Sequence, residues 1–165
     1  MGKTLDHLKE AFAGESQANR KYLAFAQQAE KEGFKAAAKL FRAAAAAETV
    51  HAHSHLRAMD GIGSTAENLK EAVAGETHEF KSMYPEMIED AKQEENKAAE
   101  RSFSYANEVE KIHARLYQEM LDTLDNLKSV DCYYVCSVCG NTVADEAPDT
   151  CPICKAGKKA FERID

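Results

Sequence analysis

The feature of the sequence that most constrains its fold is a repeating spacing of apolar residues from residue 4 to about residue 128. Apolar side chains recur at alternating steps of four and three, which is the spacing of a helix with one buried face. The segment is rich in Ala, Glu, Lys, Gln and Leu, which favour helices, and its first proline is Pro85. A chain with this pattern buries its apolar faces by packing helices side by side, so the sequence predicts a four-helix bundle.

Glycines mark the ends of the first two predicted helices. The first helix reaches Gly33, and the second runs from about Phe34 to Met59 and stops before Gly61 and Gly63. Glycine is common just after a helix because it adopts the left-handed conformation without strain.

The third predicted helix begins at a capping box, in which Ser64 caps the first turn and Glu67 reaches back to it. We expect Pro85 to kink this helix or to be accommodated locally, because proline lacks a backbone donor. We expect Asn96 to take a left-handed conformation at its end. The fourth helix is predicted from about Lys97 to Lys128.

The helical pattern stops at Val130, and the chain continues with four closely spaced cysteines. They form two Cys-x-x-Cys pairs separated by eleven residues: Cys136, Cys139, Cys151 and Cys154. A module of about 35 residues cannot hold itself together by apolar burial alone. Four thiolates at this spacing favour a tetrahedral iron or zinc site, and the thiolates themselves do not distinguish these metals. The sequence therefore predicts two domains, residues 1–129 and 130–165.

The bundle segment contains two copies of one helix hairpin. Ala-Gly-Glu followed by Ser or Thr occurs at 13–16 and at 74–77, 61 residues apart, and Glu-x-x-His occurs at 48–51 and 110–113, 62 residues apart. Each copy thus offers one single Glu and one Glu-x-x-His pair. The six residues are Glu15, Glu48, His51, Glu76, Glu110 and His113.

All six residues fall on faces that the periodicity predicts to be buried. An ionised carboxylate in an apolar interior is strongly unfavourable unless it is paired or bound to a metal, and few Lys or Arg residues share these stripes. Two divalent or trivalent cations would satisfy the whole set, and carboxylate with imidazole suits iron or manganese. The alternative is that the helices are rotated, with four solvated glutamates and two core histidines.

The repeat is broken at Glu79, which follows Glu76 by three residues, whereas the position equivalent to it beside Glu15 is Ala18. A fifth carboxylate on one side would make the two metals chemically unequal. This asymmetry suits a site that changes ligands with its redox state. The alternative is an ordinary surface glutamate.

The glutamate and histidine pattern, Glu79 and the two cysteine pairs together resemble the rubrerythrin family over essentially the full chain. The resemblance implies an all-α, left-handed, ferritin-like bundle that holds a non-haem di-iron centre with two irons per chain. It also implies a C-terminal rubredoxin-like domain with one iron held by four cysteines. Zinc could substitute in either site.

The resemblance also implies how the metal ligands are divided between the two irons. Glu48 and Glu110 would bridge the irons, and Glu15 would bind one of them. Glu76 and His113 would bind the other iron.

His51 and Glu79 would exchange at the first iron between the reduced and oxidised states, and this implied exchange agrees with the broken repeat. Tyr22 and Tyr84 match tyrosines that lie beside the centre in this family, although each could be an ordinary core aromatic. Lys155 is a departure from the family pattern, because a glycine often follows the fourth cysteine, where the turn requires a positive φ.

The activity implied by the resemblance is reduction of hydrogen peroxide to water in oxidative-stress defence. Electrons would arrive through the cysteine-bound iron from an NAD(P)H-linked external reductase or a rubredoxin. We expect the cysteine domain to lie far from its own di-iron centre, which favours a head-to-tail homodimer or higher homo-oligomer, with exchanged helices as one arrangement. The alternatives are a ferritin-like ferroxidase or iron-handling protein, and a non-enzymatic module with a structural zinc ribbon.

The net charge of −7 argues against a nucleic-acid partner, which would need clustered Lys and Arg. The sequence contains no apolar run near the roughly 18 residues of a membrane span and shows no secretory segment. Five cysteines in such a chain favour a reducing compartment. We therefore expect a cytoplasmic protein without a membrane partner.

Overall fold

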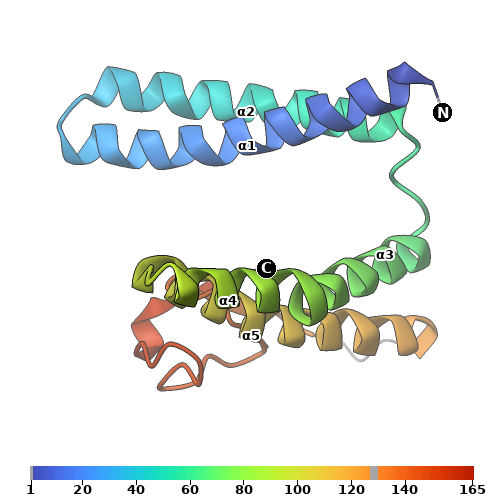
Figure 1. Cartoon of the computed structure of the whole chain (residues 1–165), viewed down its shortest axis with the longest axis vertical. Coiled ribbons are helices and arrows are strands. Elements are labelled where there is room, and N and C mark those ends of the chain that lie inside the picture. The colour runs from blue at the N-terminus through green and yellow to red at the C-terminus, as the bar shows by residue number, and fades with distance from the viewer. Residues whose placement is uncertain (1, 127–129) are drawn as a thin grey trace. The chain divides into compact units, whose positions relative to one another are not determined.

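A computed structural model describes residues 2–126 and 130–165, and the chain forms two compact units, residues 1–63 and 64–165. In the first unit, α1 (Lys3–Lys31) and α2 (Lys35–Ala58) lie side by side as an antiparallel hairpin (Figure 1). In the described ranges, no helix is long and apolar enough to cross a membrane.

The apolar residues most deeply buried in the first unit are alanines. Small side chains allow close approach of the helix backbones, and those of α2 recur every seven residues, about two helical turns. They are Ala26 and Ala29 of α1, and Ala38, Ala45 and Ala52 of α2. Gly33 has φ +86 in the loop between the helices, as predicted from the sequence.

The second unit begins with a helix that consists of three consecutive elements. These are α3 (Thr65–His78), the π-helix η1 (Glu79–Met83) and α4 (Tyr84–Gln93). Both hydrogen bonds of the capping box at Ser64 are present, which confirms that prediction. α5 (Lys97–Asp122) packs against all three elements and completes the second hairpin (Figure 1).

The π-helix is the local accommodation of Pro85. The Tyr84 N–H donates to the Glu79 carbonyl, five residues back, instead of the usual four. The wider turn places Pro85 in the first turn of α4, where a missing backbone donor is tolerated.

The π-helix also explains why the two repeat spacings differ. Glu15 and Glu76 are 61 residues apart, whereas the buried Ala29 and Ala91 near the ends of the same two helices are 62 apart. One additional residue therefore lies between these points in the second copy. An inserted residue produces a π-turn when the α-helix on either side of it keeps the same face toward its neighbour.

The prediction of a left-handed Asn96 is wrong. Glu95 has the positive φ, +56, and Asn96 caps α5 by accepting a hydrogen bond from the Ala99 N–H at 3.1 Å. Glu95 lies 62 residues after Gly33, so the repeat extends through the loop and places the left-handed residue at the same point in both copies.

α5 ends earlier than predicted. Its last residue is Asp122, and the 3-10 turn η2 follows at Leu124–Asn126. The Thr123 hydroxyl donates to the Glu119 carbonyl at 2.8 Å, a side-chain bond that is common where a helix ends. The predicted helical residues 127 and 128 lie outside the described residues.

The C-terminal residues 130–165, here called the cysteine module, form a small antiparallel sheet. Its strands are β1 (Tyr133–Cys136), β2 (Thr142–Ala144) and β3 (Phe161–Ile164), in the order β2-β1-β3. The 3-10 turn η3 (Lys158–Ala160) precedes the last strand. The predicted fold class, mainly helical with a small C-terminal β and loop domain, is confirmed.

Candidate metal centres

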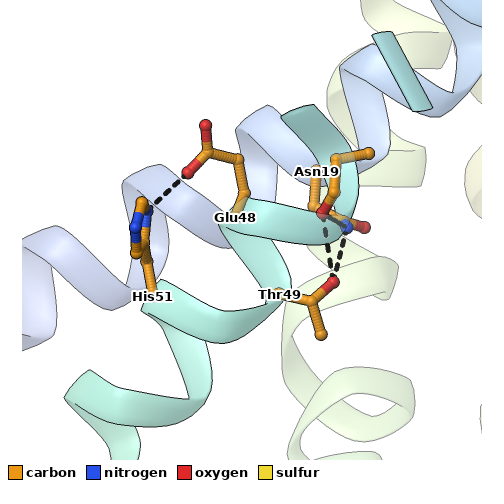
Figure 2. A network of polar contacts seen from close by, with 5 residues as sticks. Asn19, Glu48, Thr49 and His51 are labelled. Carbon is orange, nitrogen blue, oxygen red and sulfur yellow. Dashed lines mark hydrogen bonds and ion pairs between the residues drawn. The ribbon is translucent and has the colours of Figure 1, made fainter. Parts of the chain in front are cut away.

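The first unit brings together Glu15 from α1 with Glu48 and His51 from α2, which we call the first half-site. Each offers a ligand atom, and these atoms all lie within 4.8 Å of one another. Glu48 and His51 are three residues apart, so they share one face of α2. Figure 2 shows the two side chains turned toward each other, with His51 Nδ1 2.8 Å from Glu48 Oε2.

A polar contact on the other side of Glu48 pins α1 to α2. The buried Asn19 side chain donates from Nδ2 to the Ala45 carbonyl at 2.7 Å and to Thr49 Oγ1 at 2.9 Å (Figure 2). Asn19 lies one turn after Glu15 and Thr49 adjoins Glu48, so the contact sets the register that brings these carboxylates together. Sequence analysis missed this role, although a polar Asn19 on an otherwise apolar stripe was the available signal.

The second unit brings together Glu76 from α3 with Glu110 and His113 from α5, which we call the second half-site. Their ligand atoms also lie within 4.8 Å of one another. His113 Nδ1 is 2.7 Å from Glu110 Oε2 and 3.9 Å from Glu76 Oε1. The other ring nitrogen, Nε2, is 2.9 Å from Thr142 Oγ1 in the cysteine module.

The carboxylates of the second half-site repel one another in a partly dehydrated setting. Burial, and then the negative charge of Glu110, raise the pKa of Glu76 to about 7. Burial and Glu110 likewise raise the pKa of Glu79. The Glu110 side chain is 15% exposed, so it does not face bulk water. A bound cation would relieve this repulsion, and the donor set therefore fits a metal ion.

The four cysteines of the predicted site come together at the end of β1 and in the two following loops. Cys136 Sγ lies 3.6 Å from Cys154 Sγ, and Cys139 Sγ lies 3.6 Å from Cys151 Sγ. Metal–sulfur bonds of about 2.3 Å in a tetrahedron place sulfurs about 3.8 Å apart, whereas a disulfide would need about 2.05 Å. The sulfur spacing fits one tetrahedral metal ion.

The rubrerythrin family model matches residues 6–121, and the model for the rubredoxin-like domain of rubrerythrin matches residues 134–162. The chain belongs to the rubrerythrin family. It is 38% identical to rubrerythrin-2 of Clostridium acetobutylicum, over 96% of this chain and 95% of the relative. It is 34% identical to nigerythrin of Nitratidesulfovibrio vulgaris, over 98% of this chain and 86% of the relative.

Solved structures of nigerythrin are similar over nearly the whole chain. The fully reduced, all-ferrous state of nigerythrin has a TM-score of 0.60 and 32% sequence identity, covering 99% of this chain and 88% of that chain. The rubrerythrin resemblance drawn from the sequence is therefore confirmed.

Glu79 occupies an unusual backbone position. It is the first residue of η1, immediately after α3. Its carboxylate is close enough for the charges of Glu110 and His113 to act on it. Among the described residues, however, the compact ligand group consists of Glu76, Glu110 and His113 without Glu79.

Two tyrosines lie within electrostatic reach of the second half-site. Burial and then the charge of Glu79 raise the pKa of Tyr84, and burial and then Glu76 raise that of Tyr117. Both hydroxyls therefore stay protonated at neutral pH and can donate hydrogen bonds. Sequence analysis missed Tyr117 as a site residue, although it follows His113 by four residues on the same helical face.

Tyr22, the other tyrosine expected beside the centre, lies in an aromatic cluster of the first unit. Its ring centroid is 6.3 Å from that of Phe25 and 6.2 Å from that of Phe41.

The two cysteine pairs are built alike, with a positive φ after the second cysteine of each. Gly140 has φ +83 and donates its N–H to the Cys136 carbonyl, and Lys155 has φ +65 and donates to the Cys151 carbonyl. Lys155 thus adopts the conformation that usually favours glycine, at some cost in backbone strain.

Backbone donors already stabilise a thiolate at one of the four cysteines. Burial acts to raise the pKa of Cys151, but hydrogen bonds from the N–H groups of Cys154 and Ile153 and from the neighbouring Cys139 and Cys154 thiols together lower it to about 7. A thiolate that is accessible near neutral pH binds metal readily.

Proposed function

We propose that this chain is a peroxidase that reduces hydrogen peroxide to water in oxidative-stress defence. One peroxide takes up two electrons and two protons and leaves as two waters. In this proposal residues 1–129 form the catalytic domain, residues 130–165 carry electrons to it, and the protein works in the cytoplasm.

The proposed catalytic cofactor is a di-iron centre assembled from both half-sites. Glu48 and Glu110 would each hold both irons, Glu15 would hold the first, and Glu76 with His113 would hold the second. These roles follow the family resemblance and are supported by the two compact ligand groups. Carboxylate and imidazole ligands suit iron, and the similar nigerythrin has been solved in an all-ferrous state.

When bound, the two ferrous ions supply one electron each and act as Lewis acids toward the peroxide oxygens. The chain supplies the negative charge that keeps the oxidised pair close to neutral in a dehydrated site. The protonated Tyr84 hydroxyl offers a hydrogen bond near Glu79. His51 and Glu79 would be the two ligands available for exchange at the first iron.

The observation that carries this proposal is the direct contact between the cysteine module and the second half-site. Thr142 of the module meets His113 at 2.9 Å, so the one-electron carrier is held against a ligand of the reactive centre. A ferritin-like storage protein has no use for such a carrier.

Electrons reach the cysteine-bound iron from an external reductase linked to NAD(P)H or from a rubredoxin. The expectation that the module lies far from its own metal ligands is wrong for the second half-site. We propose a head-to-tail homodimer or higher homo-oligomer, with exchanged helices as one arrangement.

The test uses the full chain loaded anaerobically with iron and reduced. Metal analysis should give three irons per chain, and each hydrogen peroxide should oxidise two of the ferrous ions without releasing oxygen. Retention of many more irons after aerobic iron addition would instead show a ferritin-like function. Absence of iron–thiolate absorption, with zinc present, would show the structural ribbon.

A further inference from the structure

The cysteine module follows α5 in register over several helical turns. Alternate residues of 138–144 meet successive turns of α5. Val138 lines a cavity with Tyr105, and Gly140 lies close to Val109. Thr142 contacts His113, and Ala144 lines a cavity with Leu116. Within residues 138–144 the strand is β2, Thr142–Ala144, in which two residues rise about 6.6 Å, against 5.4 Å for one turn of α5. The packing of these residues on α5 brings Thr142 to His113.

The hydroxyl of Thr142 has one proton, and its two neighbours decide where that proton points. Thr142 Oγ1 is 3.0 Å from the Gly140 carbonyl, which can only accept, and 2.9 Å from His113 Nε2. The hydroxyl therefore donates to Gly140 and accepts from the imidazole. His113 is thereby held with its proton on Nε2.

The opposite ring nitrogen faces the carboxylates. His113 Nδ1 lies 2.7 Å from Glu110 Oε2, a separation at which two lone pairs repel unless a proton or a cation lies between them. A metal ion that enters this group would lie between Nδ1 and the carboxylates and would bind the free lone pair of Nδ1. The proton on Nε2 is unaffected because it remains in the hydrogen bond to Thr142 Oγ1.

We propose that Thr142 is a positioning residue that selects Nδ1 of His113 as the metal-binding atom and raises the metal affinity of the second half-site. Partners of this kind, on the far nitrogen of a metal-binding imidazole, fix its orientation and increase its basicity. The proposal rests on the metal site of the proposed function. It adds a residue of the cysteine module to that site.

The same geometry makes the second half-site sensitive to the cysteine-bound metal. Thr142 donates to Gly140, and the Gly140 N–H donates to the Cys136 carbonyl at 2.8 Å. Thr142 is therefore anchored to the cysteine loop that the metal closes. Filling the cysteine site orders Thr142, and through it His113.

His51 in the first half-site is a natural internal control. Its ring hydrogen-bonds to Glu48 (Figure 2). Within residues 2–126 and 130–165 the ring has no second hydrogen-bond partner. The His51 side chain is 56% exposed, against 27% for His113. A change at Thr142 should therefore leave His51 as it is.

The test compares the full wild-type chain with Thr142→Val, which removes the hydroxyl at nearly constant volume, and with Thr142→Ser, which keeps it. All three carry zinc in the cysteine site and ¹⁵N-labelled histidine, and zinc ions are then titrated into the half-sites. Wild type and Thr142→Ser should keep a protonated Nε2 on His113 and bind zinc through Nδ1. Thr142→Val should mix the two ring forms and bind zinc about tenfold more weakly at His113.

Unchanged His113 signals and zinc affinity in Thr142→Val would overturn the proposal, as would an equal loss in Thr142→Ser. A second measurement on the wild type is independent of whether Thr142→Val folds. The His113 Nε2 proton should exchange with solvent much more slowly than any ring proton of His51, and equal rates would also overturn the proposal. Failure of the wild-type His113 to bind zinc at all would count against the proposed function itself.

Discussion

The two half-sites have the same three residue types at matched positions of an internal repeat, yet the structure holds their histidines differently. His51 contacts Glu48 and leaves more than half of its side chain exposed, whereas His113 is held between Glu110 and Thr142. A ring with one partner can leave a metal at less cost than a ring with two. The difference favours His51 as the exchanging ligand and His113 as the permanent one.

A second difference lies in the helix that carries the single glutamate. In the first unit Glu15 lies in an unbroken α-helix, but Glu76 lies in the last turn of α3, and the π-helix begins three residues later at Glu79. The first half-site is fixed by the polar contact of Asn19 with α2, and the second by the cysteine module. The two copies of the hairpin are therefore stabilised by unrelated contacts.

The largest effect should come from Cys151→Ser, which removes a fully buried metal ligand. Loss of the metal should unfold the cysteine module, at a cost of about 5 kcal/mol, because structural metal sites supply much of the stability of such modules. Metal content and the ¹⁵N signals of the ring nitrogens measure the result. His113 should change and His51 should not.

Cys132→Ser is the matched control for this substitution, because Cys132 is buried but is not part of the four-cysteine group. It should retain the metal and the His113 signals. If Cys151→Ser changed the ring ¹⁵N signals of His51 and His113 equally, the two half-sites would not be stabilised by separate contacts.

The corresponding experiment on the first unit is Asn19→Ala, which removes the hydrogen bonds that fix α1 against α2. Deleting a buried donor with two acceptors should destabilise the first hairpin by about 2 kcal/mol. Hydrogen exchange should become faster in α1 and α2 while α5 keeps its protection. Thr49→Val removes one of the two acceptors of Asn19 and should have about half this effect. An equal loss of hydrogen-exchange protection in both units would contradict the conclusion that different contacts stabilise the two half-sites.

A smaller effect is expected from pH in the metal-free chain. The folded pKa of Glu76 is about 7 against an ordinary 4.5, so the folded state holds a proton that the unfolded state releases. Stability should therefore fall as pH rises from about 4.5 to 7, by about 1 kcal/mol after allowance for solvent screening. Urea unfolding at pH 5 and pH 7.5 measures it.

Glu76→Gln should remove most of this pH dependence because glutamine does not titrate. Zinc-loaded wild type is the control, since a bound cation keeps the carboxylate ionised at both pH values. A pH dependence that survives Glu76→Gln unchanged would place its origin outside the second half-site.

The smallest effect is expected at the cysteine loops, where Lys155 has the positive φ that Gly140 has in the other pair. Lys155→Gly should stabilise the metal-loaded module by about 0.5 kcal/mol, because relief of strain exceeds the added freedom of the unfolded chain. Gly140→Ala should destabilise it by about 1 kcal/mol. Thermal unfolding measures both changes in stability. If both substitutions stabilised the module, or both destabilised it, the two cysteine loops would not be equivalent.

Much of this architecture could be predicted from the sequence because its signals are local or repetitive. The capping box at Ser64, the glycine at 33 and the cysteine spacing each depend on a few neighbouring residues. The six glutamates and histidines stood out because polar residues recur on an apolar stripe in two copies.

The features that escaped prediction depend on small changes of phase or on distant contacts. Glu95 was missed because local preference favours Asn96, and only the repeat places the left-handed residue one position earlier. The π-helix was hidden in a one-residue difference between two repeat spacings. Thr142 could not be assigned because its role requires a strand to dock on a helix 29 residues away in the chain.

The single extra residue in η1 has a consequence for how a duplicated protein can acquire asymmetry. Because the π-turn absorbs the insertion within one stretch of helix, everything downstream keeps the geometry of its counterpart, from the left-handed loop residue to the Glu-x-x-His pair. Glu79, whose counterpart in the first copy is Ala18, is the first residue of this turn. The acidic group that breaks the repeat thus lies at the point where the backbone hydrogen bonds change their spacing.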